Sequence, residues 1–371
     1  MLAANLVAWW EGEAGWQGGR SVKGADHADV LAWLLLARSG PSRKRRKTVK
    51  ELVKASTDME TFIDAPGPHG LLKGTMLGPA SKHDPVVLII PGSGPTDRDG
   101  NNPLGINAST YRLLAEGLAA RNITTVRIDK RGLFASTAAT PDPNAVTIAD
   151  YVTDIDAWVS AIRQHTGAPS IWLLGHSEGG LVALAADKKR EDVCGLLLVS
   201  TPGRRAGELL REQLSVNPAN APILCQALSA IDSLENGNRV DTTNMSPALL
   251  GLFRPQVQGF LISEFSYDPA LLLENYPKPV LILQGLRDIQ VREIDARILK
   301  QADPQAMLAL LPNVNHVLKH VASDEWTDNV ATYADPELPL APGVIEAISD
   351  FIEKSDVCLS KELPLWVDSG L

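Results

Sequence analysis

Short apolar runs alternate along the chain with longer segments in which apolar residues recur every three or four positions. The short runs are typical of strands buried in a parallel sheet, and the longer segments are typical of helices with one buried face. The apolar runs occupy residues 86–90, 170–174, 278–285 and 306–311. The helical segments occupy residues 110–118, 151–159 and 179–186. This alternation predicts an α/β fold with a mostly parallel central sheet flanked by helices.

One long segment interrupts the alternation. Between Thr201, after one apolar run, and Pro279, at the start of the next, the sequence contains helical patterns separated by proline and Asn-Gly signals but no strand pattern. We therefore expect one α/β domain in two parts, residues 51–203 and 276–371. The residues between them, 204–275, are expected to form an inserted helical cap.

The first 50 residues differ in composition from the rest. They include half of the eight tryptophans and a run of five basic residues at 43–47. Such a run can bind nucleic acid or anionic lipid, but we interpret it as a solvated segment. Residues 1–50 are therefore predicted to be a flexible N-terminal extension.

Composition excludes several classes of function. The net charge of −9 argues against nucleic-acid binding by the main domain. The chain has no Walker loop, no dinucleotide-binding glycine motif, no Cys-x-x-Cys pair and no metal-ligand spacing of histidine, cysteine and carboxylate. We expect no cofactor, no metal and no stable membrane insertion, since the apolar residues 31–37 are too few to span a bilayer. The start lacks the basic region of a signal peptide, so we expect a cytoplasmic protein; a periplasmic location would require a true start downstream of Met1.

The strongest chemical signal is the motif Gly-His-Ser-Glu-Gly at residues 175–179. It stands between a strand pattern and a helical pattern, and a Gly-x-Ser-x-Gly in that setting is typical of a nucleophile elbow. The turn is so tight that small residues are needed two positions before and after the serine. We predict that Ser177 is a catalytic nucleophile. The alternative is a glycine-rich turn that only packs a helix against a sheet.

A serine nucleophile needs a base, and the base needs an orienting acid. Where a nucleophile elbow is used, the chain order is serine, acid, histidine. Only His316 and His320 lie well beyond Ser177. We predict His316 as the base because it stands nearer the end of the apolar run at 306–311. His320 is expected to lie on the surface or in a helix.

Asp288 is the predicted acid because it follows the apolar run at 278–285. Open α/β sheets place their sites just beyond the carboxyl ends of the strands, where Asp288 and His316 are both expected. Glu293 and Asp295 are rivals for this role, but they fall on a helix that begins near Val291.

The apolar run at 86–90 breaks into Pro-Gly-Ser-Gly at residues 91–94. In elbow enzymes such a loop donates one backbone N–H to the oxyanion, and the residue after the nucleophile donates the other. By position these donors are Ser93 and Glu178. The alternative for residues 91–94 is an ordinary turn.

These motifs together resemble the α/β-hydrolase fold. Three segments narrow the resemblance to bacterial esterases related to the acyl-CoA thioester hydrolase and dienelactone hydrolase groups. They are Pro-Gly-Ser-Gly-Pro-Thr-Asp-Arg-Asp-Gly-Asn at 91–101, Ile-Asp-Lys-Arg-Gly at 128–132 and Asn-His-Val-Leu-Lys at 315–319. The resemblance runs from about Gly70 to Lys354 and implies hydrolysis of carboxylic esters, usually with short acyl chains and without a cofactor. In the proteins that this chain resembles, a second glycine and a serine usually follow Arg-Gly. This chain has Leu-Phe-Ala-Ser at residues 133–136 instead, a difference that does not involve Ser177, Asp288 or His316.

Two charged loops follow neighbouring predicted strands. The charged residues are Asp97, Arg98, Asp99, Lys130 and Arg131. We interpret them as a salt-bridged frame that holds the oxyanion loop. The alternatives are direct contact of an arginine with an anionic substrate, or weak surface pairs in a solvated loop.

We therefore predict a serine carboxylesterase that hydrolyses small-molecule, short-chain esters through an acyl-enzyme. His176 and the cap residues Phe253, Phe260 and Phe265 are expected to shape the pocket; the alternative is that these phenylalanines form the core of the cap. A thioesterase or a peptidase would use the same triad. Some proteins of this fold only bind a ligand, but those usually lack a triad residue.

Overall fold

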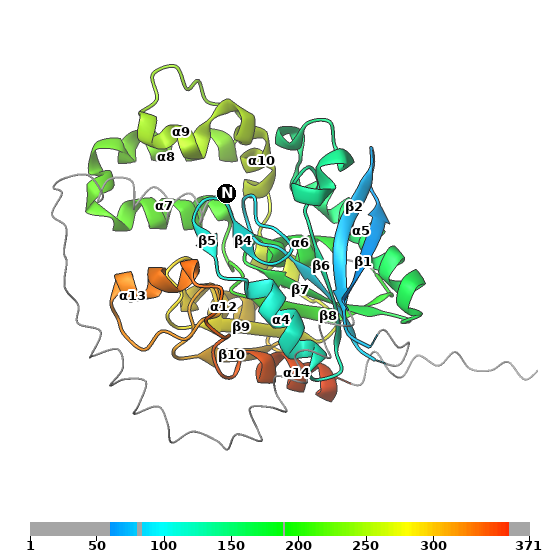
Figure 1. Ribbon diagram of the computed structural model, residues 1–371. Coiled ribbons are helices and arrows are strands. Elements are labelled where there is room, and N and C mark those ends of the chain that lie inside the picture. The colour runs from blue at the N-terminus through cyan, green and yellow to red at the C-terminus, as the bar shows by residue number, and fades with distance from the viewer. Residues whose placement is uncertain (1–59, 80–83, 188–189, 356–371) are drawn as a thin grey trace, which may run out of the picture.

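The computed structural model describes residues 60–79, 84–187 and 190–355, which form an eight-stranded sheet flanked by helices (Figure 1). The proposed N-terminal extension, residues 1–50, lies outside these residues. The strands of the sheet are β1 (Glu60–Pro66), β2 (Leu71–Leu77), β3 (Val86–Ile90), β6 (Thr124–Ile128), β7 (Ile171–His176), β8 (Val193–Val199), β9 (Val280–Gly285) and β10 (Met307–Leu311). Their order across the sheet is β1-β2-β6-β3-β7-β8-β9-β10.

The sheet is mostly parallel, as predicted. Six adjacent strands, β6, β3, β7, β8, β9 and β10, run parallel to one another. The sequence analysis did not identify β1 and β2, which pair antiparallel with each other, while β2 also pairs antiparallel with β6. β1 is an edge strand with mostly exposed positions, so it lacks the continuous apolar run that marks the buried strands.

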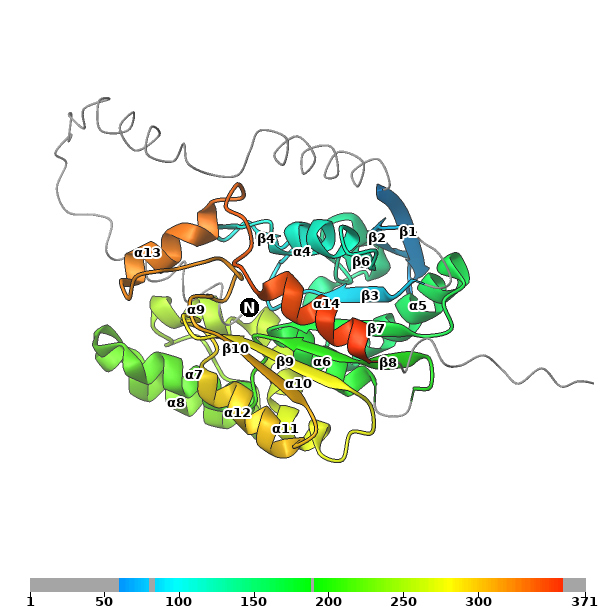
Figure 2. The same ribbon diagram turned by 90° about the horizontal axis from the view of Figure 1, so that it is seen from below.

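Successive residues of each buried strand face opposite layers of helices. In β3, Leu88 packs with one hydrophobic cluster and Val87 with the other. The first cluster lies under α5 (Ile148–Thr166), α6 (Glu178–Ala186) and α12 (Glu293–Ala302), and the second lies under α4 (Thr110–Ala119) and α14 (Val344–Lys354) (Figure 2). Burial on both faces is why these strands read as unbroken apolar runs.

The chain between β8 and β9 is helical. It forms α7 (Ala206–Val216), η3 (Pro218–Asn220), α8 (Ala221–Glu235), α9 (Pro247–Phe253), α10 (Pro255–Phe265) and α11 (Pro269–Leu273). Proline stands in the first turn of α8 to α11, where its missing N–H removes no helical hydrogen bond. Helices α7 to α10 gather at one side of the sheet (Figure 1, upper left) and share a hydrophobic cluster of their own.

The remaining elements are short. They are β4 (Asn101–Asn102), β5 (Ile106–Asn107), α13 (Trp326–Ala331), η1 (Phe134–Ala139), η2 (Pro143–Ala145) and η4 (Thr332–Ala334). Within the described residues, none of the helices has both the length and the apolar character needed to cross a membrane.

The packing of β8 on β9 can be tested at Gly195. A Cβ there would lie 2.2 Å from the carbonyl oxygen of Pro279, whereas a Cβ at Gly251 of α9 would meet nothing within 4 Å. We expect Gly195→Ala to lower the free energy of unfolding by about 1–3 kcal/mol. Gly251→Ala is expected to raise it by up to about 1 kcal/mol, because alanine is the better helix former. Chemical denaturation followed by circular dichroism measures both; a Gly195→Ala variant as stable as wild type would contradict this packing.

Candidate active site

Ser177 occupies the turn between β7 and α6. Its φ of 55° and ψ of −123° lie in a region that residues with a Cβ rarely adopt. Such a conformation costs about 1–3 kcal/mol and persists only where the surrounding structure holds it. Here the N–H of Ser177 donates to Val199 O at 2.9 Å, and its carbonyl accepts from Gly180 N at 2.9 Å. The turn is thus tied to the sheet and to its own helix.

The glycines of the motif are explained by close backbone contacts. A Cβ at Gly175 would lie 2.3 Å from Gly179 O, and a Cβ at Gly179 would lie 2.2 Å from Ile90 O. Both distances are far shorter than any tolerable contact with backbone. Residues larger than glycine would therefore force β7, α6 and β3 apart.

His316 and Asp288 come from the loops that follow β10 and β9. His316 Nδ1 lies 2.8 Å from Asp288 Oδ2, and both side chains are buried. The structure therefore brings together the histidine and the aspartate that the sequence analysis selected as base and acid.

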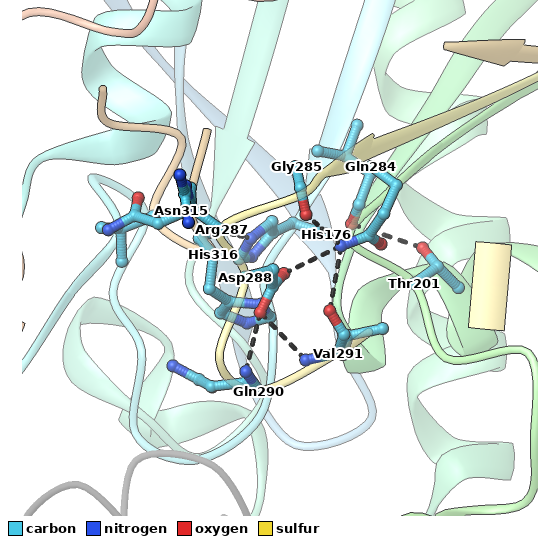
Figure 3. A network of polar contacts seen from close by, with 12 residues as sticks. His176, Thr201, Gln284, Gly285, Arg287, Asp288, Gln290, Val291, Asn315 and His316 are labelled. Atoms are coloured by element: carbon cyan, nitrogen blue, oxygen red, sulfur yellow. Dashed lines mark hydrogen bonds and ion pairs between the residues drawn. The ribbon is translucent and has the colours of Figure 1, made fainter. Parts of the chain in front are cut away.

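The second oxygen of Asp288 is also bonded. Oδ1 accepts from the backbone N–H of Gln290 at 2.8 Å and of Val291 at 2.9 Å (Figure 3). Burial alone would raise the pKa of Asp288, but the neighbouring His316 ring and these two N–H groups outweigh it, so the pKa lies below its ordinary value. Asp288 is therefore ionised and able to hold the His316 tautomer with the proton on Nδ1.

Gln284 supports Asp288 from the end of β9. Its Nε2 lies 3.3 Å from Asp288 Oδ2 and also donates to the carbonyl oxygens of Gly285 and Val291 (Figure 3). Gln284 was not among the site residues predicted from the sequence. Its signal was a single polar side chain inside an apolar run, and a buried amide needs hydrogen-bond partners.

Ser177 and His316 line one pocket, with a volume of about 40 Å³. The lining residues are Gly92, Ser93, Thr96, Gly100, Ile106, Thr110, Tyr111, His176, Ser177, Gln290, His316 and Val317. No hydrogen bond joins the Ser177 hydroxyl to His316 in the described part of the chain. Catalytic hydrogen bonds are often long before substrate binds, so this spacing is compatible with a nucleophile and its base.

The predicted oxyanion loop lies against Ser177. A Cβ added to Gly92 would be 3.2 Å from Ser177 Cβ. Among the described residues, the backbone N–H groups of Ser93 and Glu178 have no acceptor. Glu178 is the first residue of α6, where helical N–H groups have no partner within the helix. Both N–H groups are therefore available to a ligand.

His176 is buried and forms two hydrogen bonds through its ring. Nδ1 lies 2.9 Å from Tyr111 Oη, and Nε2 lies 2.8 Å from His316 O. Burial, and then the nearby His316, lower the pKa of His176 to about 3. The ring is therefore neutral at physiological pH.

The three phenylalanines expected to shape the pocket lie elsewhere. Phe253 and Phe265 are buried in the hydrophobic cluster that α7 to α10 share. Phe260 packs against the main core and contacts the ring of Tyr151. None of the three lines the pocket beside Ser177. This corrects the expectation: Phe253 and Phe265 are buried where α7 to α10 pack on one another, and Phe260 is packed against the main core.

The rival site residues have other surroundings. Asp295 is buried on α12 and accepts from Arg204 at 3.0 and 2.8 Å. Glu293 pairs with Arg297 on the surface of the same helix. His320 is exposed, as expected, but it forms an isolated bridge with Val314 rather than part of a helix.

The charged loops form a frame, as interpreted from the sequence. Arg98 Nη2 lies 2.6 Å from Asp129 Oδ2, and Arg131 Nη2 lies 2.7 Å from Asp154 Oδ1. Asp99 pairs with Arg127. Neither Arg98 nor Arg131 lines the pocket described above.

Lys130 acts on the oxyanion loop directly. Its Nζ donates to Gly92 O at 2.6 Å and lies 3.5 Å from Glu178 Oε1. Ser136, in the segment 133–136 that differs from the related esterases, is buried and donates to Asp129 O at 3.0 Å. Lys130 therefore ties its own loop to Gly92 of the oxyanion loop and to Glu178, the first residue of α6.

A model of the alpha/beta hydrolase family matches residues 86–332. The chain belongs to the alpha/beta hydrolase family. It is 26% identical over 239 residues to Esterase EstD of Thermotoga maritima, an alignment that covers 63% of this chain and 54% of EstD. The chain thus spans about half the length of the curated relative that it matches.

Solved structures of the family have the same fold. The alpha/beta hydrolase GrgF from Penicillium sp. sh18 matches with a TM-score of 0.52 and 19% identity, over 80% of this chain and 98% of GrgF. The esterase Pf2001 of Pyrococcus furiosus matches with a TM-score of 0.50 and 15% identity, over 81% of this chain and 93% of the Pf2001 chain. These likenesses and the family match confirm the predicted fold. The narrower relationship to thioester and dienelactone hydrolases stays a prediction.

The neutral state of His176 predicts a pH dependence of stability. Its pKa is about 3 in the folded protein and 6.5 when unperturbed, so below pH 6.5 the unfolded chain takes up a proton that the folded chain does not. Stability is therefore lost as the pH falls through this window. Between about pH 5.5 and pH 4, the free energy of unfolding should fall about 1.4 kcal/mol per pH unit more steeply in wild type than in His176→Phe. Urea denaturation at several pH values measures both slopes; equal slopes would contradict a neutral His176.

Proposed function

We propose that this protein is a serine carboxylesterase that hydrolyses short-chain esters through an acyl-enzyme on Ser177. One observation carries the proposal: a serine held at a φ of 55° between β7 and α6 shares a pocket with a histidine whose Nδ1 is hydrogen-bonded to a buried aspartate. Serine, base and orienting acid in this arrangement are the parts that acyl transfer requires. The name of the relative EstD, an esterase, supports the same class of substrate.

Each residue has a defined role in the proposed reaction. His316 Nε2 removes the proton of Ser177, and Asp288 stabilises the imidazolium that forms. Ser177 Oγ attacks the ester carbonyl, and the N–H groups of Ser93 and Glu178 stabilise the oxyanion. His316 then gives the proton to the leaving alcohol. In the second half, His316 activates a water molecule, which releases the acid and restores Ser177.

The size of the pocket supports a small acyl group. A cavity needs about 10–15 Å³ to hold one water molecule, so the volume of about 40 Å³ beside Ser177 accommodates only a few heavy atoms. A long acyl chain would have to leave this pocket or displace part of its wall. An acetyl-sized or propionyl-sized group fits the space available.

We further propose that residues 204–275 form a cap on the catalytic domain made of residues 51–203 and 276–371. Two contacts support this role. Gln213 of α7 donates from Nε2 to the carbonyl oxygen of Gln290, which lines the pocket, at 2.9 Å. Ser263 of α10 accepts from the N–H of Ile148 at 3.2 Å. α7 therefore contacts the loop that carries Asp288, and α10 contacts the start of α5.

A thioesterase or a peptidase remains the alternative, because the triad does not select the leaving group. Turnover of acyl-CoA and of peptide amides, compared with simple esters, distinguishes these activities. The binding-protein alternative is disfavoured because Ser177, His316 and Asp288 are all present.

The proposed small acyl pocket predicts a preference for short acyl chains. Hydrolysis of p-nitrophenyl esters from acetate to palmitate should be fastest with the shortest acyl chains. Ser177→Ala should keep the wild-type circular dichroism spectrum and lose covalent turnover, because it lacks the attacking oxygen. Unchanged hydrolysis by this variant would refute the assignment of Ser177. A profile that peaks at palmitate would refute the small acyl pocket.

The proposed role of Asp288 can be tested by an isosteric substitution. Asp288→Asn keeps the shape of the side chain but removes the charge that stabilises the imidazolium and holds the His316 tautomer. We expect kcat for p-nitrophenyl acetate to fall on the order of 1,000- to 10,000-fold. Asp328→Asn changes an exposed carboxylate of α13; it is the matched control and should retain wild-type kcat. Steady-state kinetics measure both variants, and a small loss in Asp288→Asn would show that another group orients the base.

A further inference from the structure

His176 occupies a position that the proposed reaction does not use. It ends β7, directly before Ser177, and is only 6% exposed. The sharp turn requires glycine at 175 and 179, where an added Cβ would meet backbone, but it does not require an imidazole at 176. The ring is instead bonded on both sides, to Tyr111 of α4 and to the backbone of His316.

Gly92, Tyr111, His176 and His316 form a hydrogen-bonded chain. The direction of each hydrogen bond in it follows from the two backbone groups at its ends. The N–H of Gly92 can only donate, and it donates to Tyr111 Oη at 2.9 Å. The carbonyl oxygen of His316 can only accept, so His176 Nε2 must carry a proton. The Tyr111 hydroxyl is then free to donate to an unprotonated His176 Nδ1. This chain of hydrogen bonds runs from Gly92 N–H through Tyr111 O–H and His176 to His316 O.

Only one state of the His176 ring satisfies every member of this chain. A proton on Nδ1 as well would point at Tyr111 Oη and leave the hydroxyl proton without its acceptor. Burial opposes the charged ring in addition, in agreement with the lowered pKa of His176. The neutral ring with its proton on Nε2 is therefore built into the fold.

The two ends of the chain are the two loops that must be placed relative to Ser177. Gly92 precedes Ser93, which is the proposed oxyanion donor, and His316 is the proposed base. The rings of His176 and His316 also lie close, with centroids 4.8 Å apart. We propose that His176 is a positioning residue that fixes the oxyanion loop and the base loop relative to each other. This inference rests on the proposed esterase function.

Lys130 provides a contrast within the same loop. It donates to Gly92 O, so the Gly92 residue is held at its N–H by Tyr111 and at its carbonyl by Lys130. Lys130 has no contact with the His316 loop in the described structure. The chain through His176 joins Gly92 to the carbonyl of His316, whereas Thr110, beside Tyr111, makes a separate contact with the base loop by donating to Val317 O at 3.1 Å.

Kinetics of His176→Phe, Tyr111→Phe and the double variant test the inference. Each single variant keeps an aromatic ring but breaks the chain. We expect kcat for p-nitrophenyl acetate to fall about 10- to 100-fold, because displacing reacting groups by about 1 Å can cost about 100-fold. KM should change by less than about threefold, since each variant keeps an aromatic ring in the lining of the pocket. The double variant should be about as slow as the slower single variant, because both changes break one chain.

Two further variants serve as comparisons. His176→Gln keeps an N–H donor that can reach His316 O, so it should be faster than His176→Phe. Tyr276→Phe removes a half-buried hydroxyl that donates to Asp187, away from the pocket, and should retain wild-type kcat and KM. Folded His176→Phe and Tyr111→Phe variants with kcat within about twofold of wild type would overturn the inference. Single losses that multiply in the double variant would overturn it as well.

The ring state is measured independently of catalysis. Nitrogen-15 NMR of the His176 side chain should show a neutral ring with its proton on Nε2 from about pH 5 to pH 8. A protonated ring, or a neutral ring with its proton on Nδ1, would overturn the hydrogen-bonded chain whether or not any ester is hydrolysed.

Labelling by a fluorophosphonate separates this inference from the proposed function. In that reaction Ser177 Oγ bonds to phosphorus, its proton passes to His316, and fluoride leaves. A wild type that is neither labelled nor active on esters contradicts the proposed function. A labelled wild type whose rate of labelling is unchanged in Tyr111→Phe and His176→Phe contradicts the positioning role alone.

Discussion

Ser177 has a φ of 55° because the backbone must pass from the end of β7 into α6 within a single residue. That turn exists only because Gly175 and Gly179 allow backbone atoms to approach closer than any side chain would permit. The strain is held by hydrogen bonds from the neighbouring strand and from α6. The other parts of the site are loops at the carboxyl ends of β3, β9 and β10, parallel strands of the same sheet, so their positions are set relative to this turn.

The fold and the placement of the three proposed triad residues at one edge of the sheet were predictable because each carries a strong local pattern. Strands buried on both faces read as apolar runs, and the elbow joins such a run to a helix. Asp288 and His316 stand just after two further runs, which identifies the edge of the sheet at which they meet. The edge strand β1 has no such pattern, since most of its residues are exposed, and the sequence analysis missed it.

The supporting contacts were not predictable, because they join residues far apart in the chain. His176 is 65 residues from Tyr111 and 140 residues from the His316 carbonyl with which it bonds. The placement of Phe253 and Phe265 depended on how α7 to α10 pack together, which the helical pattern of each segment does not define. Gln284 carried a weak signal, as a polar residue in an apolar run, but its partner Asp288 became evident only in the folded chain.

The central claim is that Ser177 is a nucleophile that forms an acyl-enzyme with His316 as its base. The most direct measurement is mass spectrometry of the protein quenched within the first turnover of p-nitrophenyl acetate, followed by identification of the modified peptide. The account predicts one acetyl group on Ser177 in wild type, and its strong depletion in His316→Ala. Acetylation of a different residue, or turnover that proceeds with no acetylated protein in either the first turnover or the steady state, would contradict it.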